Sequence, residues 1–356
     1  MTIARELAEF LVGTSSADLP RQAVEHAAML IASTLASAAM GAGLQSSAII
    51  RDLARERSGN PEASVWFDPG PKLPVSDAAR VNAVMSDAAA SDDSDLRNIV
   101  HAGTTLVATA LAMAERTSAS GDDVLTAIVL GYEAAGRIGE AITPGFRARG
   151  FHGCVGAIFG GAVAEARLLR LDVPHMAQAI ALSATSIGGL MAAANTSVAR
   201  EYHAGLAAML GLEAALAARR GYQAEEAILE TRNGFFEVYG GIDGVAAAGS
   251  VTRDLGRSWD IITDMAIKLV PGGHPYHALA EAAANAAKKA DIMPDAIESI
   301  TVSCPGFTAL TGPLHPSDLI AMAHSPAHFL AAGQLIGTSH GYTRRHPRSP
   351  IQLSMS

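Results

Sequence analysis

Cysteine is scarce in this sequence. The chain has 356 residues, and two of them, Cys154 and Cys304, are cysteines. Two thiols cannot supply the three thiolates of an iron–sulfur hydratase cluster or fill a four-ligand zinc site. So little cysteine is typical of a reduced compartment, and we expect a cytoplasmic protein that holds no metal ion.

Positive charge and long hydrophobic runs are also lacking. The formal net charge is −9, and charged residues make up only 17% of the chain. Because a nucleic-acid partner requires a basic face, we expect none. The longest uncharged stretch contains "AIALSATSIGGLMAAANTSVA", which is rich in Ala and Gly and carries Ser, Thr and Asn. Such residues drive membrane insertion poorly, so we expect no membrane span.

The phosphate-binding motifs of nucleotide enzymes are missing as well. The sequence contains no G-x-G-x-x-G after a predicted strand and no P-loop. Both motifs place backbone N–H groups around phosphates, so their absence disfavours a nucleotide cofactor. We therefore expect that the protein uses no cofactor.

Apolar residues at helical spacing dominate the first part of the chain. Hydrophobic residues make up 49% of the sequence and the mean hydropathy is +0.22, which suits extensive buried helix surface and a subunit interface. Helices are predicted over 20–43, where Gly41 and Gly43 end the pattern, and from Ser120, whose capping position precedes two aspartates. Strand patterns are nearly absent, so residues 1–255 are predicted to form an all-helical domain.

The pattern changes after residue 255. An Ala-rich helix over 277–290 is followed by a segment that alternates apolar and polar residues, as a β-strand does. We therefore predict a smaller α+β domain over 256–333. The last residues, 334–356, are basic and rich in Pro and Ser, and they are predicted to form a disordered tail. The expected fold class is mainly α.

A histidine precedes an Ala- and Gly-rich helical pattern at four places, which are His101, His152, His203 and His277. The first turn of a helix presents unpaired N–H groups and a partial positive charge, which attract carboxylates and oppose protonation of a nearby imidazole. Such a histidine stays neutral and can act as a base near pH 7. Alternatively, each histidine caps a buried helix and is satisfied by a neighbouring carbonyl.

An acidic loop lies shortly before the first of these histidines. Asp92, Asp93 and Asp95 precede His101 by six to nine residues, so one loop can bring a carboxylate to the imidazole. A paired carboxylate would fix the tautomer of the ring and raise its basicity. The alternative is a solvated acidic loop, while a calcium loop of the EF-hand type would need a glycine and a closing glutamate that are missing.

Two cations have positions that fit an anion-binding site. Lys268 lies between apolar segments and precedes a Pro-Gly-Gly turn, so it either extends to solvent or binds an anion in a cleft. Arg200 lies three residues before His203 and can clamp a carboxylate with two hydrogen bonds, unless it pairs with its neighbour Glu201.

The ordered succession of four segments resembles the MmgE/PrpD family over most of residues 1–335. The segments are "DDSDLRNIVHAGTTLVATALAMAE", "RGFHGCVGAIFGGAVAEARLLRLD", "REYHAGLAAMLGLEAALAARRGY" and "IKLVPGGHPYHALAEAA". The family includes 2-methylcitrate dehydratase, cis-aconitate decarboxylase and iminodisuccinate epimerase. The resemblance implies a large all-helical domain, a smaller α+β lid domain, a homodimer, and metal-free chemistry on small polycarboxylates.

The residue patterns and the resemblance together give a set of candidate site residues. The candidate catalytic residues are His101, His152, Lys268, Asp92 and Asp93. The candidate substrate-binding residues are Arg200, His203, His277 and Ser94. Arg200 stands where dehydratase and decarboxylase members commonly carry a lysine, and arginine is a poor proton donor, so we expect it to bind a carboxylate. The chain also ends early for this family, so we expect a C-terminally truncated, incomplete lid.

We expect a metal-independent lyase that acts on a small di- or tricarboxylate. His101, oriented by Asp92 or Asp93, would remove a proton next to a carboxylate, and His152 would assist as an acid. A dehydratase similar to 2-methylcitrate dehydratase is the first choice, and an epimerase, isomerase or decarboxylase is the alternative, because all of these can share one enediolate intermediate. A catalytically silent, truncated dimerising protein is the alternative from another class.

Overall fold

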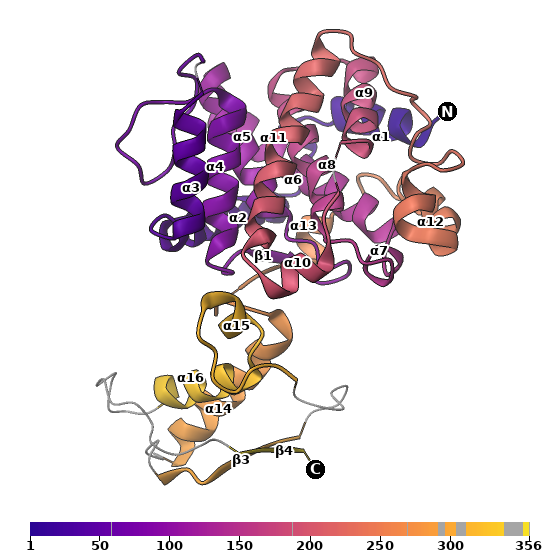
Figure 1. The fold of residues 1–356 in the computed structure, drawn as a ribbon. Helices are drawn as coiled ribbons and strands as arrows, with labels where there is room; N and C mark the ends of the chain where they lie inside the picture. The colour runs from indigo at the N-terminus through magenta and orange to yellow at the C-terminus, as the bar shows by residue number, and fades with distance from the viewer. Residues whose placement is uncertain are drawn as a thin grey trace. The chain divides into compact units, whose positions relative to one another are not determined.

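The structure is a computed structural model of the chain (Figure 1). It describes residues 1–57, 59–186, 188–268, 270–290, 296–303, 311–337 and 352–355. The chain divides into two compact units, Met1–Lys268 and Leu269–Ser356, and each has its own cluster of buried hydrophobic residues.

Helices make up most of the first unit, and the prediction of a mainly α fold is confirmed. The helices are α1 (Ile3–Gly13), α2 (Arg21–Gly41), α3 (Gln45–Arg55), α4 (Val75–Ala88), α5 (Ala102–Thr117), α6 (Gly121–Ala141), α7 (Gly145–Ala148), α8 (Cys154–Leu168), α9 (Val173–Ala184), α10 (Met191–Thr196), α11 (Ala199–Arg219), α12 (Gly241–Ala247) and α13 (Asp260–Thr263). The unit also contains two short strands, β1 (Asp93–Asp95) and β2 (Met265–Ile267).

Several helix ends follow the capping chemistry that the sequence predicted. α6 begins after Ser120, whose hydroxyl oxygen accepts a hydrogen bond from the N–H of Asp123 at 3.1 Å. The carboxylate of Asp123 accepts a reciprocal bond from the N–H of Ser120 at 3.3 Å. These two bonds satisfy backbone donors that the helix itself leaves unpaired. α2 ends at Gly41, as predicted.

α8 packs mainly against α5, α6, α9 and α11 and also contacts α1. Nearly all of its side chains are buried. Gly131 of α6 faces Gly160 of α8 so closely that a Cβ at Gly131 would lie 2.8 Å from the carbonyl oxygen of Gly160. Larger residues at this crossing would push the helices apart, which gives a packing reason for the Gly- and Ala-rich sequence of α8.

α2 is the one helix in the described part of the chain that is long and apolar enough to cross a membrane. This is a statement about length and composition, and core helices of other proteins meet the same criterion. In the first unit α2 packs against α4, α5, α6 and α13. Its Ala23, Ala27 and Leu30 belong to the hydrophobic core.

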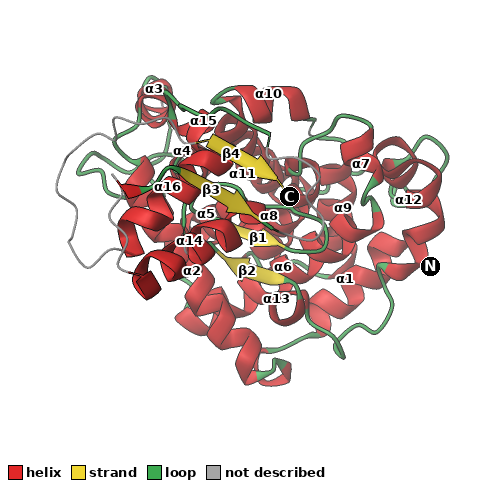
Figure 2. Cartoon of the chain, turned by 90° about the horizontal axis from the view of Figure 1, so that it is seen from below, coloured by secondary structure: helices red, strands yellow, loops and turns green. Residues whose placement is uncertain are grey.

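A small antiparallel sheet joins the acidic loop to the end of the first unit. β1 pairs with β2 so that Asp93 lies opposite Ile267 and Asp95 opposite Met265 (Figure 2). Asp92 directly precedes β1 and Lys268 directly follows β2, so the antiparallel register makes them neighbours. This pairing also attaches residues 256–268 to the first unit, and the division between the units therefore lies beyond residue 255, where the sequence placed a boundary.

The second unit combines helices and strands. Its elements are α14 (His277–Ala290), β3 (Ser299–Val302), α15 (Leu319–Ala323), α16 (Pro326–Gly337) and β4 (Gln352–Met355). α14 packs against α16 around Leu279, Ala283 and Leu330, and β3 pairs in parallel with β4. β3 is the strand that the alternating pattern predicted.

The tail over 334–356 was expected to be disordered. Residues 338–351 and 356 lie outside the described residues. The described parts of the tail are in regular structure, because 334–337 continue α16 and 352–355 form β4. Disorder of the tail as a whole stays a prediction.

Candidate active site

Asp92 lies between a lysine and a histidine. Its Oδ1 accepts a hydrogen bond from Lys268 Nζ at 2.8 Å, and its Oδ2 is 2.9 Å from His101 Nδ1. The side chains of Asp92 and Lys268 are buried, while 24% of the His101 side chain is exposed. Burial opposes ionisation of Asp92, but the charges of Lys268 and His101 outweigh it and hold the pKa of this carboxyl well below its usual range. Asp92 is therefore a carboxylate at all physiological pH values.

The surroundings of His101 fix its tautomer. Besides Asp92, Nδ1 contacts the backbone carbonyl oxygen of Asp93 at 2.6 Å. Carboxylate and carbonyl oxygens only accept hydrogen bonds, so Nδ1 must carry a proton. In the neutral ring the lone pair is then on Nε2. Nε2 is therefore the atom of His101 that can take up and return a proton.

The side chain of Asp93 caps α5. Its two carboxylate oxygens each lie 3.1 Å from the N–H of Gly103, and the hydroxyl of Tyr132 donates to Oδ2 at 2.6 Å. A Cβ at Gly103 would lie 2.6 Å from both Asp93 Oδ2 and the Tyr132 hydroxyl, so this approach requires glycine. Burial raises the pKa of Asp93 to about 6. Of the two aspartates expected to orient His101, Asp92 thus contacts it with its carboxylate and Asp93 with its backbone.

Arg200 is paired within the protein. Its Nε donates to Asp87 Oδ2 at 2.9 Å, and its Nη2 donates to the Asp87 carbonyl oxygen at 2.5 Å. Glu201, the alternative partner suggested by the sequence, accepts instead from the hydroxyl of Ser46 at 2.6 Å. The pair with Asp87 holds the guanidinium in place and neutralises part of its charge, so a bound carboxylate would have to use the remaining N–H groups of Arg200.

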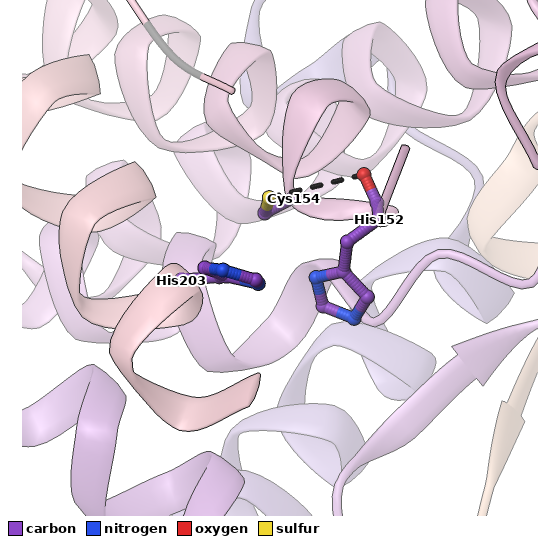
Figure 3. A group of neighbouring side chains, drawn as sticks. All are labelled: His152, Cys154 and His203. Carbon is purple, nitrogen blue, oxygen red and sulfur yellow. Dashed lines mark hydrogen bonds between the residues drawn. The ribbon is translucent and has the colours of Figure 1, made fainter. Parts of the chain in front are cut away.

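His152, Cys154 and His203 form a second cluster of side chains (Figure 3). The two imidazole centroids are 5.2 Å apart. His152 lies just before α8, as predicted. His203 instead lies inside α11, which begins at Ala199, so the prediction of a helix start at His203 is wrong. The reason is that the preceding Ala, Arg and Glu residues are good helix formers and extend the helix backwards.

Electrostatic interactions connect the two clusters. Burial lowers the pKa of His152 to about 3, and the positive charges of His101 and Arg200 contribute to the lowering. The charge of Arg200 also lowers the pKa of Asp92. His152 is therefore neutral at pH 7, where it can donate an N–H hydrogen bond but holds no second proton to release.

The remaining predicted residues differ in their positions. Lys268 does not extend to solvent, because it is only 7% exposed and is held by Asp92. Ser94 is buried in β1, where its hydroxyl donates to the carbonyl oxygen of Asp95 at 3.4 Å. His277 begins α14 in the second unit.

Sequence reasoning missed Asp87, Tyr132, Cys154 and Gly189 as parts of these clusters. Asp87 pairs with a residue 113 positions away, a separation at which no local pattern is informative. One signal was available. Asp87 is an acidic residue near the end of α4, a helix with nearly all of its residues buried, and a buried charge needs a partner. Glycines that allow close approach, such as Gly189, leave no such signal.

The arrangement around His101 is suited to general acid–base chemistry. A partly exposed imidazole has one nitrogen fixed by a buried carboxylate and the other free to exchange a proton. The carboxylate stabilises the imidazolium that forms after proton uptake. Lys268 and Arg200 add positive charge to the same region, which favours an anionic substrate.

Comparisons with known proteins agree with the motifs. A family model described as the MmgE/PrpD N-terminal domain matches residues 5–247. The chain is 28% identical over 283 residues to a cis-aconitate decarboxylase of Aspergillus terreus, and the match covers 73% of this chain and 55% of that protein. It is 28% identical over 329 residues to cis-aconitate decarboxylase of Homo sapiens, covering 89% of this chain and 67% of that protein. The chain thus spans little more than half the length of the Aspergillus relative. Because the family model matches well over half of the chain, in the unit that contains the Asp92–His101 pair, the protein belongs to the MmgE/PrpD family.

Proposed function

We propose that this protein is a lyase that acts on a small di- or tricarboxylate by moving a proton at a carbon next to a carboxylate. The observation that carries the proposal is the sharing of Asp92 between His101 and Lys268. It fixes an imidazole with a free Nε2 beside a buried cation, and both features are needed to exchange a proton with an anionic substrate.

In the proposed mechanism His101 is both the base and the acid. As a base, its Nε2 takes the proton, and Asp92 stabilises the resulting imidazolium through Nδ1–H. As an acid, the same Nε2–H returns the proton to carbon. The negative charge that develops on the substrate carboxylate is stabilised by Lys268, Arg200 and the N–H groups of the neutral imidazoles of His152 and His203. This replaces the acid role expected for His152 by that of a hydrogen-bond donor.

Decarboxylation is now the first candidate reaction, because the relatives carry the name cis-aconitate decarboxylase. In that reaction the bond between a carbon and its carboxylate breaks, CO₂ leaves, and the electron pair is delocalised toward a remaining carboxylate. His101, which has taken up a proton from the solvent beforehand, then gives this proton to carbon from Nε2. Dehydration, the first choice from the sequence, would instead start with proton removal and end with loss of the hydroxyl group as water. Epimerisation would need a proton from the solvent or from another acid on the opposite face, because His101 lies on one side of the substrate.

Proton NMR in D₂O tests the proposal whichever product forms. The full chain is incubated separately with cis-aconitate, citrate, 2-methylcitrate and tartrate derivatives. We expect one of these compounds to be converted with incorporation of deuterium at the carbon next to a carboxylate, and decarboxylation adds release of CO₂. If no compound is converted or exchanges a proton, the lyase proposal fails and a non-catalytic protein is favoured.

Two variants connect the activity to the site. His101→Ala should abolish conversion and exchange while the circular dichroism spectrum and thermal midpoint stay close to those of the wild type. His175→Ala is the matched control, because His175 is a partly exposed histidine paired with the exposed Asp172. Full turnover by His101→Ala would refute the role of this residue. Because the proposed reaction uses no metal ion, activity should also persist after dialysis against EDTA.

A further inference from the structure

The proposed reaction uses the N–H groups of His152 and His203, but it gives no role to the Cys154 sulfur that lies beside them. One ring nitrogen of each histidine and the Cys154 sulfur all lie within 4.8 Å of one another. It is the one group of His, Cys, Asp or Glu residues with this property among the residues that the structure describes. Figure 3 shows the three side chains arranged around a common point, with the sulfur above the two rings.

Polar atoms in this cluster lack partners. Nδ1 of His152 and Nδ1 of His203 are buried without a hydrogen-bond partner in the described part of the chain. His203 is only 9% exposed. Among the described residues, the contacts of the Cys154 thiol are long, 3.8 Å to the carbonyl oxygen of His152 and 4.0 Å to that of Gly188. Buried polar atoms are normally satisfied, so orphaned nitrogens that converge beside a sulfur indicate a missing ligand.

The backbone leaves little room for a side chain at this point. A Cβ at Gly189 would lie 2.6 Å from Cys154 Sγ and 3.2 Å from His203 Nδ1. The sulfur and the unpaired nitrogen of His203 therefore lie beside the same glycine. The N–H of His152 donates to the carbonyl oxygen of Gly189 at 2.9 Å, and this hydrogen bond holds the backbone of Gly189 beside the cluster.

The chemistry of the three donors selects a class of ligand. Two imidazoles and one thiolate are a donor set that Zn²⁺ accepts, with Zn–N distances of about 2.1 Å, Zn–S distances of about 2.3 Å and a fourth position open to water. Tetrahedral coordination at these lengths places donor atoms about 3.6 Å apart. The donor atoms now lie within 4.8 Å of one another, so binding requires the three side chains to move closer together. The charge of Asp87 acts on both Cys154 and His203, and it offsets part of the charge of a cation.

We propose that His152, Cys154 and His203 bind one thiophilic divalent cation, represented by Zn²⁺, and that the bound ion inhibits the enzyme. Binding forms two bonds from imidazole nitrogens and one from the sulfur, and the thiol proton passes to the solvent. The ion occupies the imidazoles that would otherwise face the substrate, so the enzyme without metal is the active form. The inhibitory consequence rests on the proposed lyase function, whereas the binding site does not.

Cobalt provides a readout of binding that does not depend on activity. The full chain, stripped of metal with EDTA and kept reduced, is titrated with Co²⁺ and followed by absorption. A cysteine ligand gives a sulfur-to-cobalt charge-transfer band in the near ultraviolet, and we expect this band to saturate at one equivalent. Addition of one equivalent of Zn²⁺ should then abolish it. A titration without the band would overturn the proposal, whatever the catalytic result.

Variants assign the band to the cluster. Cys154→Ala should eliminate the band and weaken Zn²⁺ binding by at least about 100-fold, because loss of a ligand costs more than loss of an outer contact. Gly189→Ala keeps all three ligands but crowds the sulfur and His203, and it should also weaken binding. Cys304→Ser removes the other cysteine and should retain the band. Retention of the band in Cys154→Ala would place the metal elsewhere and refute the site.

Activity measurements separate the two parts of the inference. In the wild type, stoichiometric Zn²⁺ should inhibit turnover, and EDTA should restore it. In Cys154→Ala, inhibition by the same concentration of Zn²⁺, expressed relative to the metal-free activity of that variant, should be lost. A cobalt band without inhibition by Zn²⁺ would refute the inhibitory role. If the cobalt band appears but the protein converts no polycarboxylate, the metal site is supported and the lyase function is refuted.

Discussion

The two carboxylate oxygens of Asp92 contact two different partners, and the electrostatics of the site depend on both contacts. One oxygen binds Lys268 and the other lies beside His101, so one buried negative charge stabilises a permanent cation and a transient one. From the sequence, Asp92 and Asp93 were equivalent candidates for orienting His101. They differ because alternate residues at a strand edge point in opposite directions, which sends the Asp93 side chain to α5.

Asp92→Asn tests this division of charge. The amide keeps the size of the side chain but stabilises an imidazolium poorly, so kcat should fall by at least about 100-fold. The KM should change less, because Lys268 and Arg200 remain. Steady-state kinetics at a fixed pH gives both quantities, with thermal unfolding as a check on the fold. A variant with wild-type kcat would show that the charge of Asp92 is not used in turnover.

At the scale of elements, the start of α5 depends on a carboxylate from a neighbouring strand. The residue before α5 is His101, whose side chain makes no capping bond to the helix. Asp93 of β1 supplies the acceptor instead, and it reaches the helix because Gly103 has no side chain. His101 is thereby free to use its ring for proton transfer. Sequence patterns look for a capping residue directly before the helix. A capping carboxylate that comes from a separate strand could therefore not be predicted.

Gly103→Ala should break this cap. Its Cβ would lie 2.6 Å from Asp93 Oδ2, so the carboxylate must move, and we expect a loss of about 2 kcal/mol of stability. Gly121→Ala is the matched control, because Gly121 also begins a helix and a Cβ there meets nothing within 4 Å. Urea unfolding of both variants measures the difference. Equal stabilities would contradict the proposed cap.

The packing of α13 on α6 buries a second group of charges. The N–H of Asp260 donates to Glu133 at 2.9 Å, and Glu133 in turn binds Arg137. Burial raises the pKa of Asp260 to about 8, and the negative charge of Glu133 adds to the rise. The folded protein therefore keeps a proton on Asp260 at pH values where the unfolded chain has lost it.

This retained proton makes stability depend on pH. Between its ordinary pKa of 3.8 and about 8, Asp260 binds more protons in the folded state, so stability falls as the pH rises. The contribution is about 1.4 kcal/mol per pH unit. Urea unfolding between pH 6.5 and 8 should show a downward slope that is flatter in Asp260→Asn. Asp122→Asn, at an exposed position of α6, should keep the wild-type slope. An unchanged slope in Asp260→Asn would contradict the assignment.

At the scale of the whole molecule, both clusters of functional side chains lie in the first unit. That unit ends at Lys268, whereas the family match ends at residue 247, so the lysine that holds Asp92 comes from beyond the matched segment. Large apolar side chains are exposed on the same unit, among them Ile242 at 89% and Leu190 at 62%. We propose that the protein is a homodimer, as the resemblance to the family implied, since apolar surface of this kind is often covered by another subunit.

Light scattering after size-exclusion chromatography tests the homodimer. We expect twice the mass of one chain at micromolar concentrations, both with and without substrate. A single-chain mass over the whole concentration range would refute the dimer. The cytoplasmic location stays a separate proposal, which fractionation of the native cells would test.

The sequence by itself determined the helices, many of their ends, and the residue types of the site. Apolar spacing and caps such as Ser120 act within a few residues, so local patterns were sufficient for these features. The tertiary structure decided which side chains meet. The contacts of Asp92 with Lys268 and of Arg200 with Asp87 join residues 176 and 113 positions apart. Such contacts depend on strand register and helix crossings, which follow from the packing of the whole core and leave no local trace in the sequence.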